Sequence, residues 1–219
     1  LMTWLNDHIW PAEGAFVSEA FIADGTQLAM AEMLRTGTTT FSDMYFFPEI
    51  VAQLAHDAGM RAQVCFPLLD FPTPWGSGPD EYLSKGEAFI KQWQDNTFIM
   101  PAIGPHAPYT VSDEPLSKAV ALSQATGAPI QIHLHETAFE VADALEKSGK
   151  RPTARLAELK VLGANTQCVH MTQIDESDVA LLQSTGAHVI HCPESNLKLA
   201  SGLSPVQTFR KAGVNVAIG

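Results

Sequence analysis

The feature that most constrains the fold is a regular alternation between short apolar runs and longer stretches of helical period. Strands that are apolar throughout are buried on both faces, which is typical of a parallel sheet covered by helices. The sequence therefore predicts an α/β fold with parallel strands. Seven runs rich in Val, Ile, Phe and Cys have the length and composition of such strands: Thr38–Tyr45, Arg61–Leu69, Phe98–His106, Pro129–Glu136, Thr166–Thr172, His188–Pro193 and Val214–Gly219.

The stretches between these runs are amphipathic, and several end in a glycine just before the next strand. A glycine there adopts the left-handed conformation that a helix-to-strand turn needs; Gly37 and Gly127 are examples. The predicted helices are Ser18–Arg35, Pro48–Ala58, Asp80–Gln94, Ser112–Ala125, Phe139–Lys147, Thr153–Glu158, Glu176–Ser184 and Pro205–Lys211.

Successive strand–helix units without a low-complexity linker favour a (β/α)₈ barrel of the TIM type over an open doubly wound sheet. An open nucleotide-binding sheet would carry a GxGxxG or GxxxxGK phosphate loop, and neither occurs. Seven strands are one short of closure. We therefore expect residues 1–219 to form one incomplete barrel domain, with the first strand and the C-terminal part outside the chain.

Composition and charge narrow the classes of partner. Hydrophobic residues make up 46% and charged residues 17%, as in ordinary globular proteins. The formal net charge of −11 and the absence of clustered Lys and Arg argue against nucleic acid. No apolar run reaches about 18 residues and no signal-peptide pattern opens the chain, so we expect no membrane partner and a cytoplasmic location. Cys65, Cys168 and Cys192 lie far apart and are expected to be core thiols.

Polar side chains recur at the carboxyl ends of the predicted strands, where barrels of this type place their functional residues. His106, His133, His170 and His191 lie at the ends of four consecutive strands, and Asp43 lies at the end of an earlier one. Packing does not explain the repetition, because imidazole fills such a position no better than Leu or Val. A shared chemical role is the better explanation.

The run Pro129–Glu136 is the most informative of these strands. Alternation directs His133 and His135 to one face. Neutral imidazole is a preferred ligand of zinc and related divalent ions. Glu136 follows where the strand gives way to a loop, so its carboxylate is expected to reach a metal-bound water and move its proton to a substrate nitrogen.

The motifs together resemble the amidohydrolase superfamily, and most closely the methylthioadenosine/S-adenosylhomocysteine deaminases, which are related to the triazine hydrolases. His133-Leu134-His135-Glu136-Thr137 resembles the H-x-x-E-T element of these deaminases. Four further segments resemble other elements of the family. In chain order they are Met30 to Thr40, Gly104-Pro105-His106-Ala107-Pro108-Tyr109, Cys168-Val169-His170, and His191-Cys192-Pro193-Glu194-Ser195-Asn196-Leu197-Lys198-Leu199.

The resemblance implies a metal-dependent hydrolase that deaminates adenosine-type nucleosides to the inosine-type product and ammonia. By matching positions, His133 corresponds to a metal ligand, Glu136 to the proton-shuttling acid, which also contacts the substrate, and His170 to the histidine that polarises the attacking water. His106 and Glu13 correspond to substrate-binding residues. The family implies one divalent metal ion per site, most often zinc, and a small-molecule nucleoside substrate. We also expect the protein to form a homo-oligomer.

Two departures from the family pattern leave alternatives open. The family's H-x-H ligand pair lies on its first strand, whereas the H-x-H present here is His133/His135 on another strand. The two arginines that hold a substrate carboxylate have no match within residues 65–82. The alternatives are another heterocycle hydrolase of the superfamily, such as a triazine hydrolase or a guanine-type deaminase, or an inactive fragment that lacks most metal ligands.

Some residues allow two interpretations. Asp43 is either a partner of site residues, or a helix-capping or buried hydrogen-bonded acid. Trp75 and Phe71 form either a lid over an apolar substrate tail or a surface loop held by its own aromatic rings. Asn196 is expected to shape the loop after its strand through local side-chain to backbone bonds.

The missing elements give a first testable expectation. We expect an H-x-H pair upstream of Leu1 and Thr-Asp directly after Gly219, because these supply the metal ligands that the chain lacks. Sequencing the gene on both sides of this segment checks the expectation. Absence of either element would contradict the interpretation as a metal-dependent deaminase.

Overall fold

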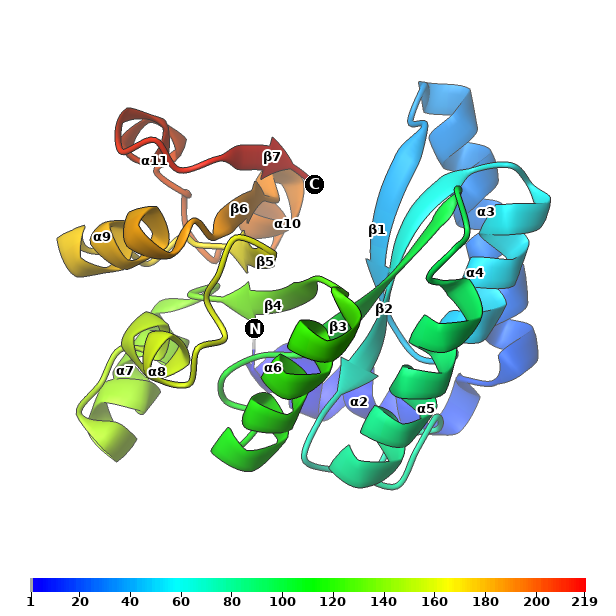
Figure 1. The fold of residues 1–219 in the computed structure, drawn as a ribbon, viewed down its shortest axis with the longest axis horizontal. Coiled ribbons are helices and arrows are strands. Elements are labelled where there is room, and N and C mark those ends of the chain that lie inside the picture. The colour runs from blue at the N-terminus through cyan, green and yellow to red at the C-terminus, as the bar shows by residue number, and fades with distance from the viewer. Residues whose placement is uncertain (1) are drawn as a thin grey trace. The chain divides into compact units, whose positions relative to one another are not determined.

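The computed structural model describes residues 2–219. They divide into two compact units, Met2–Gly104 and Pro105–Gly219. In both units parallel strands alternate with helices along the chain, as Figure 1 shows. The predicted α/β organisation is thus confirmed.

The first unit consists of a helical N-terminal segment followed by strands whose order in the sheet, β1-β2-β3, is the order in the sequence. Strands β1 and β2 are parallel, with Thr40 opposite Arg61 and Met44 opposite Cys65. The elements are α1 (Met2–Trp4), the π-helix η1 (Leu5–Ile9), α2 (Trp10–Phe16), α3 (Glu19–Thr36), β1 (Thr40–Met44), α4 (Pro48–Asp57), β2 (Arg61–Leu68), α5 (Pro79–Trp93) and β3 (Ile99–Pro105).

The core of the first unit surrounds β2, because both α4 and α5 pack against this strand. Val64, Phe66 and Leu68 of β2 are fully buried, as is Tyr82 of α5. Gly86 lies on the buried face of α5 directly against the Phe66 ring. The missing side chain at this position therefore lets α5 approach β2 closely.

The second unit continues the pattern with the strand order β4-β5-β6-β7. Ile132, Cys168 and Val189 lie side by side in the register of β4, β5 and β6, and all three are fully buried. The elements are α6 (Asp113–Thr126), β4 (Ile130–Leu134), α7 (Ala138–Ser148), α8 (Pro152–Glu158), β5 (Thr166–His170), α9 (Glu176–Thr185), β6 (His188–His191), α10 (Pro193–Lys198), α11 (Val206–Lys211) and β7 (Val216–Ile218).

The predicted glycine stops are confirmed after α3 and α6, although the helices themselves end within one residue of the predicted positions. Gly37 ends α3 with φ 91° and Gly127 ends α6 with φ 77°, both in the left-handed region. A side chain there would cost conformational energy that glycine avoids.

All seven predicted strands are longer than the observed ones, and two of these differences have a clear local cause. The run predicted to extend to Pro193 ends at His191, and Pro193 begins α10 instead. Proline lacks the N–H that a strand needs, but it suits the first turn of a helix. The run predicted to extend to Glu136 ends at Leu134, because His135 has a left-handed backbone with φ 51°.

The aromatic residues of the loop before α5 have different environments. Trp75 is 4% exposed, stacks on Tyr82 at a ring-centroid distance of 5.8 Å, and donates from Nε1 to Glu49. Phe71 remains 38% exposed and contacts Trp10. In this structure Trp75 is thus a packing residue of the first unit, which favours the loop interpretation over the lid for this side chain.

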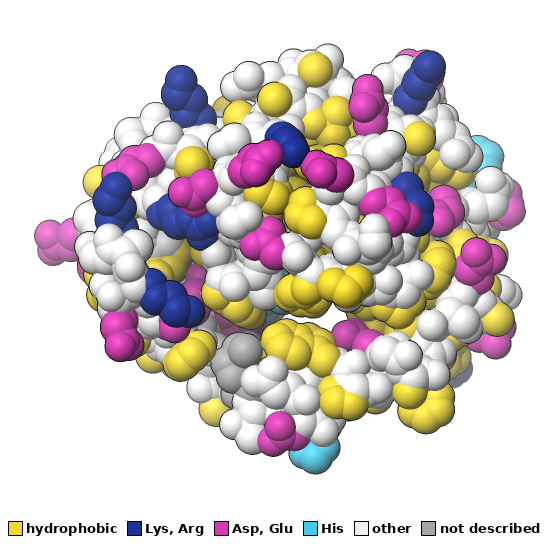
Figure 2. Space-filling model, turned by 90° about the horizontal axis from the view of Figure 1, so that it is seen from below, with side chains coloured by type: hydrophobic (Ala, Val, Ile, Leu, Met, Phe, Trp, Pro, Cys, Tyr) yellow, Lys and Arg dark blue, Asp and Glu magenta, His cyan; other side chains and the backbone are white. Residues whose placement is uncertain are grey.

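The distribution of surface charge and the character of the helices are relevant to binding of nucleic acid and membranes. On the face drawn in Figure 2, Lys and Arg side chains lie interspersed with Asp and Glu. Within residues 2–219, no helix combines the length and the apolar character needed to cross a bilayer.

Of the three thiols, Cys65 and Cys168 are buried as expected, whereas Cys192 is only partly buried.

The packing of Gly86 gives a prediction about stability. Gly86→Ala should destabilise the protein by about 1–3 kcal/mol, because the added methyl overlaps the Phe66 ring and overpacks the core. The matched control is Gly25→Ala on α3, where an added Cβ meets no atom within 4 Å. There the better helix propensity of alanine should stabilise by about 0.5–1 kcal/mol. Chemical denaturation of both variants tests the difference, and equal effects would show that α5 can move away from β2.

Candidate active site

The candidate site lies in the second unit, at the carboxyl ends of its strands. His106 follows β3 directly, His133 is the penultimate residue of β4, and His170 is the last residue of β5. Glu136 lies in the turn between β4 and α7. The structure therefore brings together four of the five predicted site residues.

His133 is held by a main-chain carbonyl. Its Nδ1 lies 2.8 Å from the carbonyl oxygen of His106, which also accepts the backbone N–H of His133 at 3.1 Å. A carbonyl oxygen only accepts, so Nδ1 carries the proton and Nε2 keeps a free lone pair. Burial lowers the pKa of His133, with a further contribution from His170. A neutral imidazole with its Nε2 lone pair free is the form that binds a metal ion.

His170 is fixed in a similar way by a side chain. Its Nδ1 lies 2.7 Å from Oδ1 of Asn196, a residue of α10 that is 1% exposed. Donation from Nδ1 to this amide oxygen again leaves Nε2 without a proton. Burial lowers the pKa of His170 and favours the neutral ring. The rings of His170 and His133 stack with centroids 5.5 Å apart.

Glu136 supplies the carboxyl group of the site. Its Oε1 is 3.8 Å from Nε2 of His170, which is longer than a hydrogen bond. The residue is 8% exposed. Burial raises its pKa, and the nearby His133 partly opposes this effect. A carboxyl group with a raised pKa is suited both to accept and to return a proton near neutrality.

His106 completes the group. Its Nδ1 is 2.9 Å from the hydroxyl oxygen of Thr110, which donates its own proton to the carbonyl of Ala107. Burial lowers the pKa of His106 to about 3, and the neighbouring His133 contributes. Its ring centroid lies 5.2 Å from that of His133. His106 is therefore a third neutral imidazole, with Nδ1 directed at Thr110.

Glu13, the fifth predicted residue, belongs to the first unit. It lies on α2, where its Oε1 accepts a hydrogen bond of 2.6 Å from the Tyr45 hydroxyl. Asp43 lies within β1, so it does not cap a helix. Burial raises the pKa of Asp43 to about 6. Among the described residues, its Oδ2 has no hydrogen-bond partner.

His135 does not extend the face that His133 occupies. Because its backbone is left-handed, the alternation of β4 stops, and its side chain enters a separate buried network. Its Nε2 accepts the backbone N–H of Thr153 at 3.4 Å, and its Nδ1 lies 3.6 Å from Asp178. Arg151 forms an ion pair with the same carboxylate, 2.5 Å away. The His135 side chain thus belongs to this buried network.

Sequence reasoning missed the partners that hold these groups. Asn196 was expected to make local backbone bonds, but its side chain contacts the ring of His170 instead. Glu140 accepts the backbone N–H groups of His135 and Glu136. The spacing Thr137-x-x-Glu140 is that of a capping box, and this pattern could have drawn attention to Glu140.

The donor set fits one part of a metal site. Within residues 2–219, no three His, Cys, Asp or Glu side chains come together as metal ligands. His133 presents a neutral imidazole oriented by a carbonyl, which is how proteins prepare a histidine ligand. A catalytic zinc usually has three protein ligands and a water. His133 therefore fits as one ligand of such a site.

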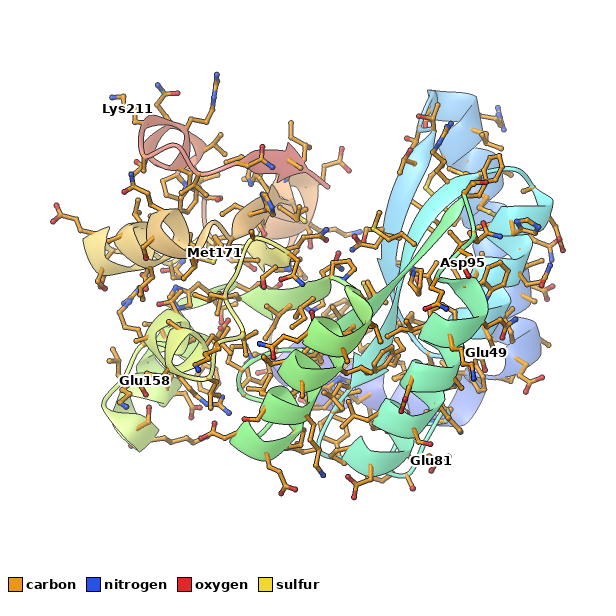
Figure 3. The ribbon with its side chains drawn as sticks, in the orientation of Figure 1. Glu49, Glu81, Asp95, Glu158, Met171 and Lys211 are labelled. Carbon is orange, nitrogen blue, oxygen red and sulfur yellow. The ribbon has the colours of Figure 1, made fainter. Side chains whose placement is uncertain are left out.

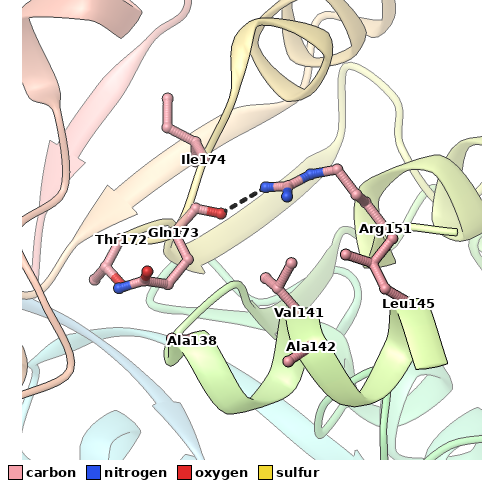
Figure 4. Close-up of a pocket in the computed structure, with 8 residues that line it drawn as sticks. All are labelled: Ala138, Val141, Ala142, Leu145, Arg151, Thr172, Gln173 and Ile174. Atoms are coloured by element: carbon pink, nitrogen blue, oxygen red, sulfur yellow. Dashed lines mark hydrogen bonds between the residues drawn. The ribbon is translucent and has the colours of Figure 1, made fainter.

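A surface pocket elsewhere in the second unit should not be confused with this site. It has a volume of about 350 Å³ and lies beside α7, with Val141 and Leu145 on one side and Gln173 on the other. Arg151 donates a hydrogen bond of 2.8 Å to the Gln173 carbonyl, drawn as a dashed line in Figure 4. None of the five predicted site residues lines this pocket.

Comparison with known proteins gives the context of these residues. The chain is 59% identical over 219 residues to a 5-methylthioadenosine/S-adenosylhomocysteine deaminase of Saccharophagus degradans. This match covers 100% of the chain and 49% of the relative. The chain is 39% identical over 225 residues to a 5'-deoxyadenosine deaminase of Methanocaldococcus jannaschii, covering 100% of this chain and 52% of the relative. The chain thus spans about half the length of the curated relatives it matches.

A solved structure and a family model agree with this result. The chain is 46% identical in sequence to an adenosine deaminase from Xanthomonas campestris, whose crystal structure was solved with bound zinc. The two structures superpose with a TM-score of 0.97, and the match covers 100% of this chain and 50% of the deaminase chain. The predicted class, an incomplete α/β barrel, is confirmed by this likeness and by the seven strands of residues 2–219. The model of the amidohydrolase family matches residues 1–219, so the chain belongs to the amidohydrolase family.

Proposed function

We propose that the protein containing this chain hydrolyses the exocyclic amino group of adenosine-type nucleosides, such as methylthioadenosine, S-adenosylhomocysteine and adenosine. The products are the inosine-type nucleoside and ammonia. The observation that carries the proposal is the arrangement at the end of β4, where the Nε2 lone pair of His133, the buried carboxyl of Glu136 and Nε2 of His170 are held close together. The names of the relatives support the same activity.

His133 would hold a divalent metal ion through Nε2. Zinc is the best candidate, because the adenosine deaminase from Xanthomonas campestris was solved with zinc. A bound divalent ion lowers the pKa of a water molecule toward neutrality. The remaining ligands would come from parts of the protein outside this chain.

The protein's own residues would then move the protons. His170 orients the attacking water by accepting a hydrogen bond at Nε2. Glu136 takes a proton from the water and delivers it to N1 of the purine, so that C6 becomes electrophilic and the water oxygen adds there. The Glu136 carboxylate next takes the remaining proton from the hydroxyl added at C6 and delivers it to the amino group. The C6–N bond then breaks, ammonia leaves, and C6 keeps the oxygen as the carbonyl of the inosine-type product. His106 and Glu13 would bind the substrate, Glu13 through the ribose hydroxyls.

The proposal also includes where the protein acts and how it assembles. We propose that it acts in the cytoplasm as a homo-oligomer. A small-molecule nucleoside is the proposed partner, in place of nucleic acid or a membrane.

A substrate panel tests the reaction class. The whole protein, loaded with zinc, should release ammonia from methylthioadenosine, S-adenosylhomocysteine or adenosine, because these carry an amino group on C6. Guanine and an amino- or chlorotriazine serve as comparison substrates. Turnover of guanine or the triazine without any adenosine-type nucleoside would replace the proposal with a different heterocycle hydrolase.

Substitutions separate the roles of His133 and Glu136. In the whole protein, Glu136→Gln should keep the metal but lower kcat at least 10²–10⁴-fold, the range typical of a lost general acid–base. His133→Ala should lose metal and activity together, because it removes a ligand. Metal content and kcat with methylthioadenosine are measured for both. A Glu136→Gln protein with near wild-type kcat would refute the assigned role, since a residue that only caps the next helix costs about 1 kcal/mol of stability and little rate.

A further inference from the structure

Two strained turns meet where the strands of the site end. His135, directly after β4, has φ 51°, and His170 and Met171 at the end of β5 have φ 80° and 48°. Met171 is labelled in Figure 3, next to the end of β5. Residues other than glycine avoid this region, and they remain there only where surrounding contacts fix them. The contacts that fix the turn after β4 therefore also determine where Glu136 points.

Glu140 makes the contacts on one side of the β4 turn. Its Oε1 accepts the backbone N–H of His135 and its Oε2 that of Glu136, each at 2.9 Å. The residue lies in the first turn of α7 and is 3% exposed. Without this carboxyl group, two buried N–H groups would lose their acceptors, which costs more than the loss of an exposed hydrogen bond.

Thr172 makes the contacts on the other side. Its hydroxyl lies 2.8 Å from the carbonyl oxygen of Glu136 and 3.1 Å from that of His135. Its backbone N–H also donates to the carbonyl of His135 at 3.0 Å. The peptide groups of His135 and Glu136 are thus fixed at their N–H groups by Glu140 and at their carbonyls by Thr172.

A helix cap alone does not account for Glu140. In a capping box the acidic residue at the third helical position bonds back to the N–H of the capping residue, which here is Thr137. Glu140 instead reaches the two residues before Thr137, and one of these is Glu136. The carboxylate therefore acts on the turn that presents the proposed proton shuttle.

We propose that Glu140 is a positioning residue for the reaction. By holding the N–H groups of His135 and Glu136, it fixes the direction in which the Glu136 side chain leaves the turn, and with it the 3.8 Å separation between Glu136 and His170. This role rests on the proposed function of Glu136. Glu140 itself touches no reacting atom.

The test is Glu140→Gln in the whole, zinc-loaded protein. The amide can accept only one of the two N–H groups, so the turn loses one restraint. We expect kcat to fall about 10–100-fold, because displacing a catalytic group by about 1 Å costs rate on this scale. KM and metal content should stay within about twofold of wild type, since the binding groups are untouched. The control is Glu146→Gln, the same chemical change at an exposed position of α7.

A second pair of variants covers the case in which Glu140→Gln does not fold. Thr172→Val removes the hydroxyl from the opposite side at nearly constant volume, and it should also lower kcat with little change in KM. Thr172→Ser should restore most of the lost rate, because it returns the hydroxyl. Unchanged kcat in Glu140→Gln, or equal losses in Thr172→Val and Thr172→Ser, would overturn the proposal.

A readout without catalysis separates this proposal from the proposed function. The backbone amide NMR signals of His135 and Glu136 should shift in Glu140→Gln and remain in place in Glu146→Gln. If the wild-type protein releases no ammonia from any nucleoside, the proposed function fails, and the amide signals alone then test the contact. Amide signals that do not respond to Glu140→Gln would refute the role of Glu140 in either case.

Discussion

The geometry of the site depends on one hydrogen bond, from Nδ1 of His133 to the main-chain carbonyl of His106. The bond fixes the tautomer of His133, and it also places the loop after β3 against the end of β4. The same carbonyl accepts the backbone N–H of His133, so the ring and the strand are held by a single acceptor. A main-chain acceptor cannot rotate away as a side chain can, and it holds the free Nε2 in a constant direction.

Burial then determines the protonation of the groups around this bond. It lowers the pKa values of His106, His133 and His170, so the rings remain neutral and their lone pairs available. The same loss of hydration raises the pKa of Glu136. Neutral bases beside a carboxyl group that exchanges its proton easily are what a hydrolytic proton shuttle requires. A metal ion would add its positive charge to this arrangement and favour the ionised carboxylate.

Much of the fold follows from local patterns, and the site follows from them only in part. The apolar runs predicted the strands to within a few residues, and glycines such as Gly37 predicted the helix ends. The repetition of histidine at strand ends predicted His106, His133 and His170. The sequence did not predict that His135 leaves the strand alternation, because a left-handed residue has no signal in a periodic pattern unless it is glycine.

The partners of the site were harder to predict for a related reason. Asn196 meets His170 from 26 positions along the chain, and such a pairing depends on how β5 and α10 are placed in space. Pairings between distant residues do not follow from propensity or spacing. Glu140 is a local partner, but its pattern in the sequence is the same as that of an ordinary helix cap.

The most direct test of the central claim is a crystal structure of the whole protein soaked with zinc, with data collected at the zinc absorption edge. The account predicts an anomalous peak about 2.0–2.1 Å from Nε2 of His133, with Nδ1 of His133 still bonded to the His106 carbonyl. Glu136 and His170 should face that peak. Nδ1 of His170 should remain bonded to Oδ1 of Asn196, as in the present structure. A peak on His135, or a His133 ring turned so that Nδ1 faces the metal, would contradict the account.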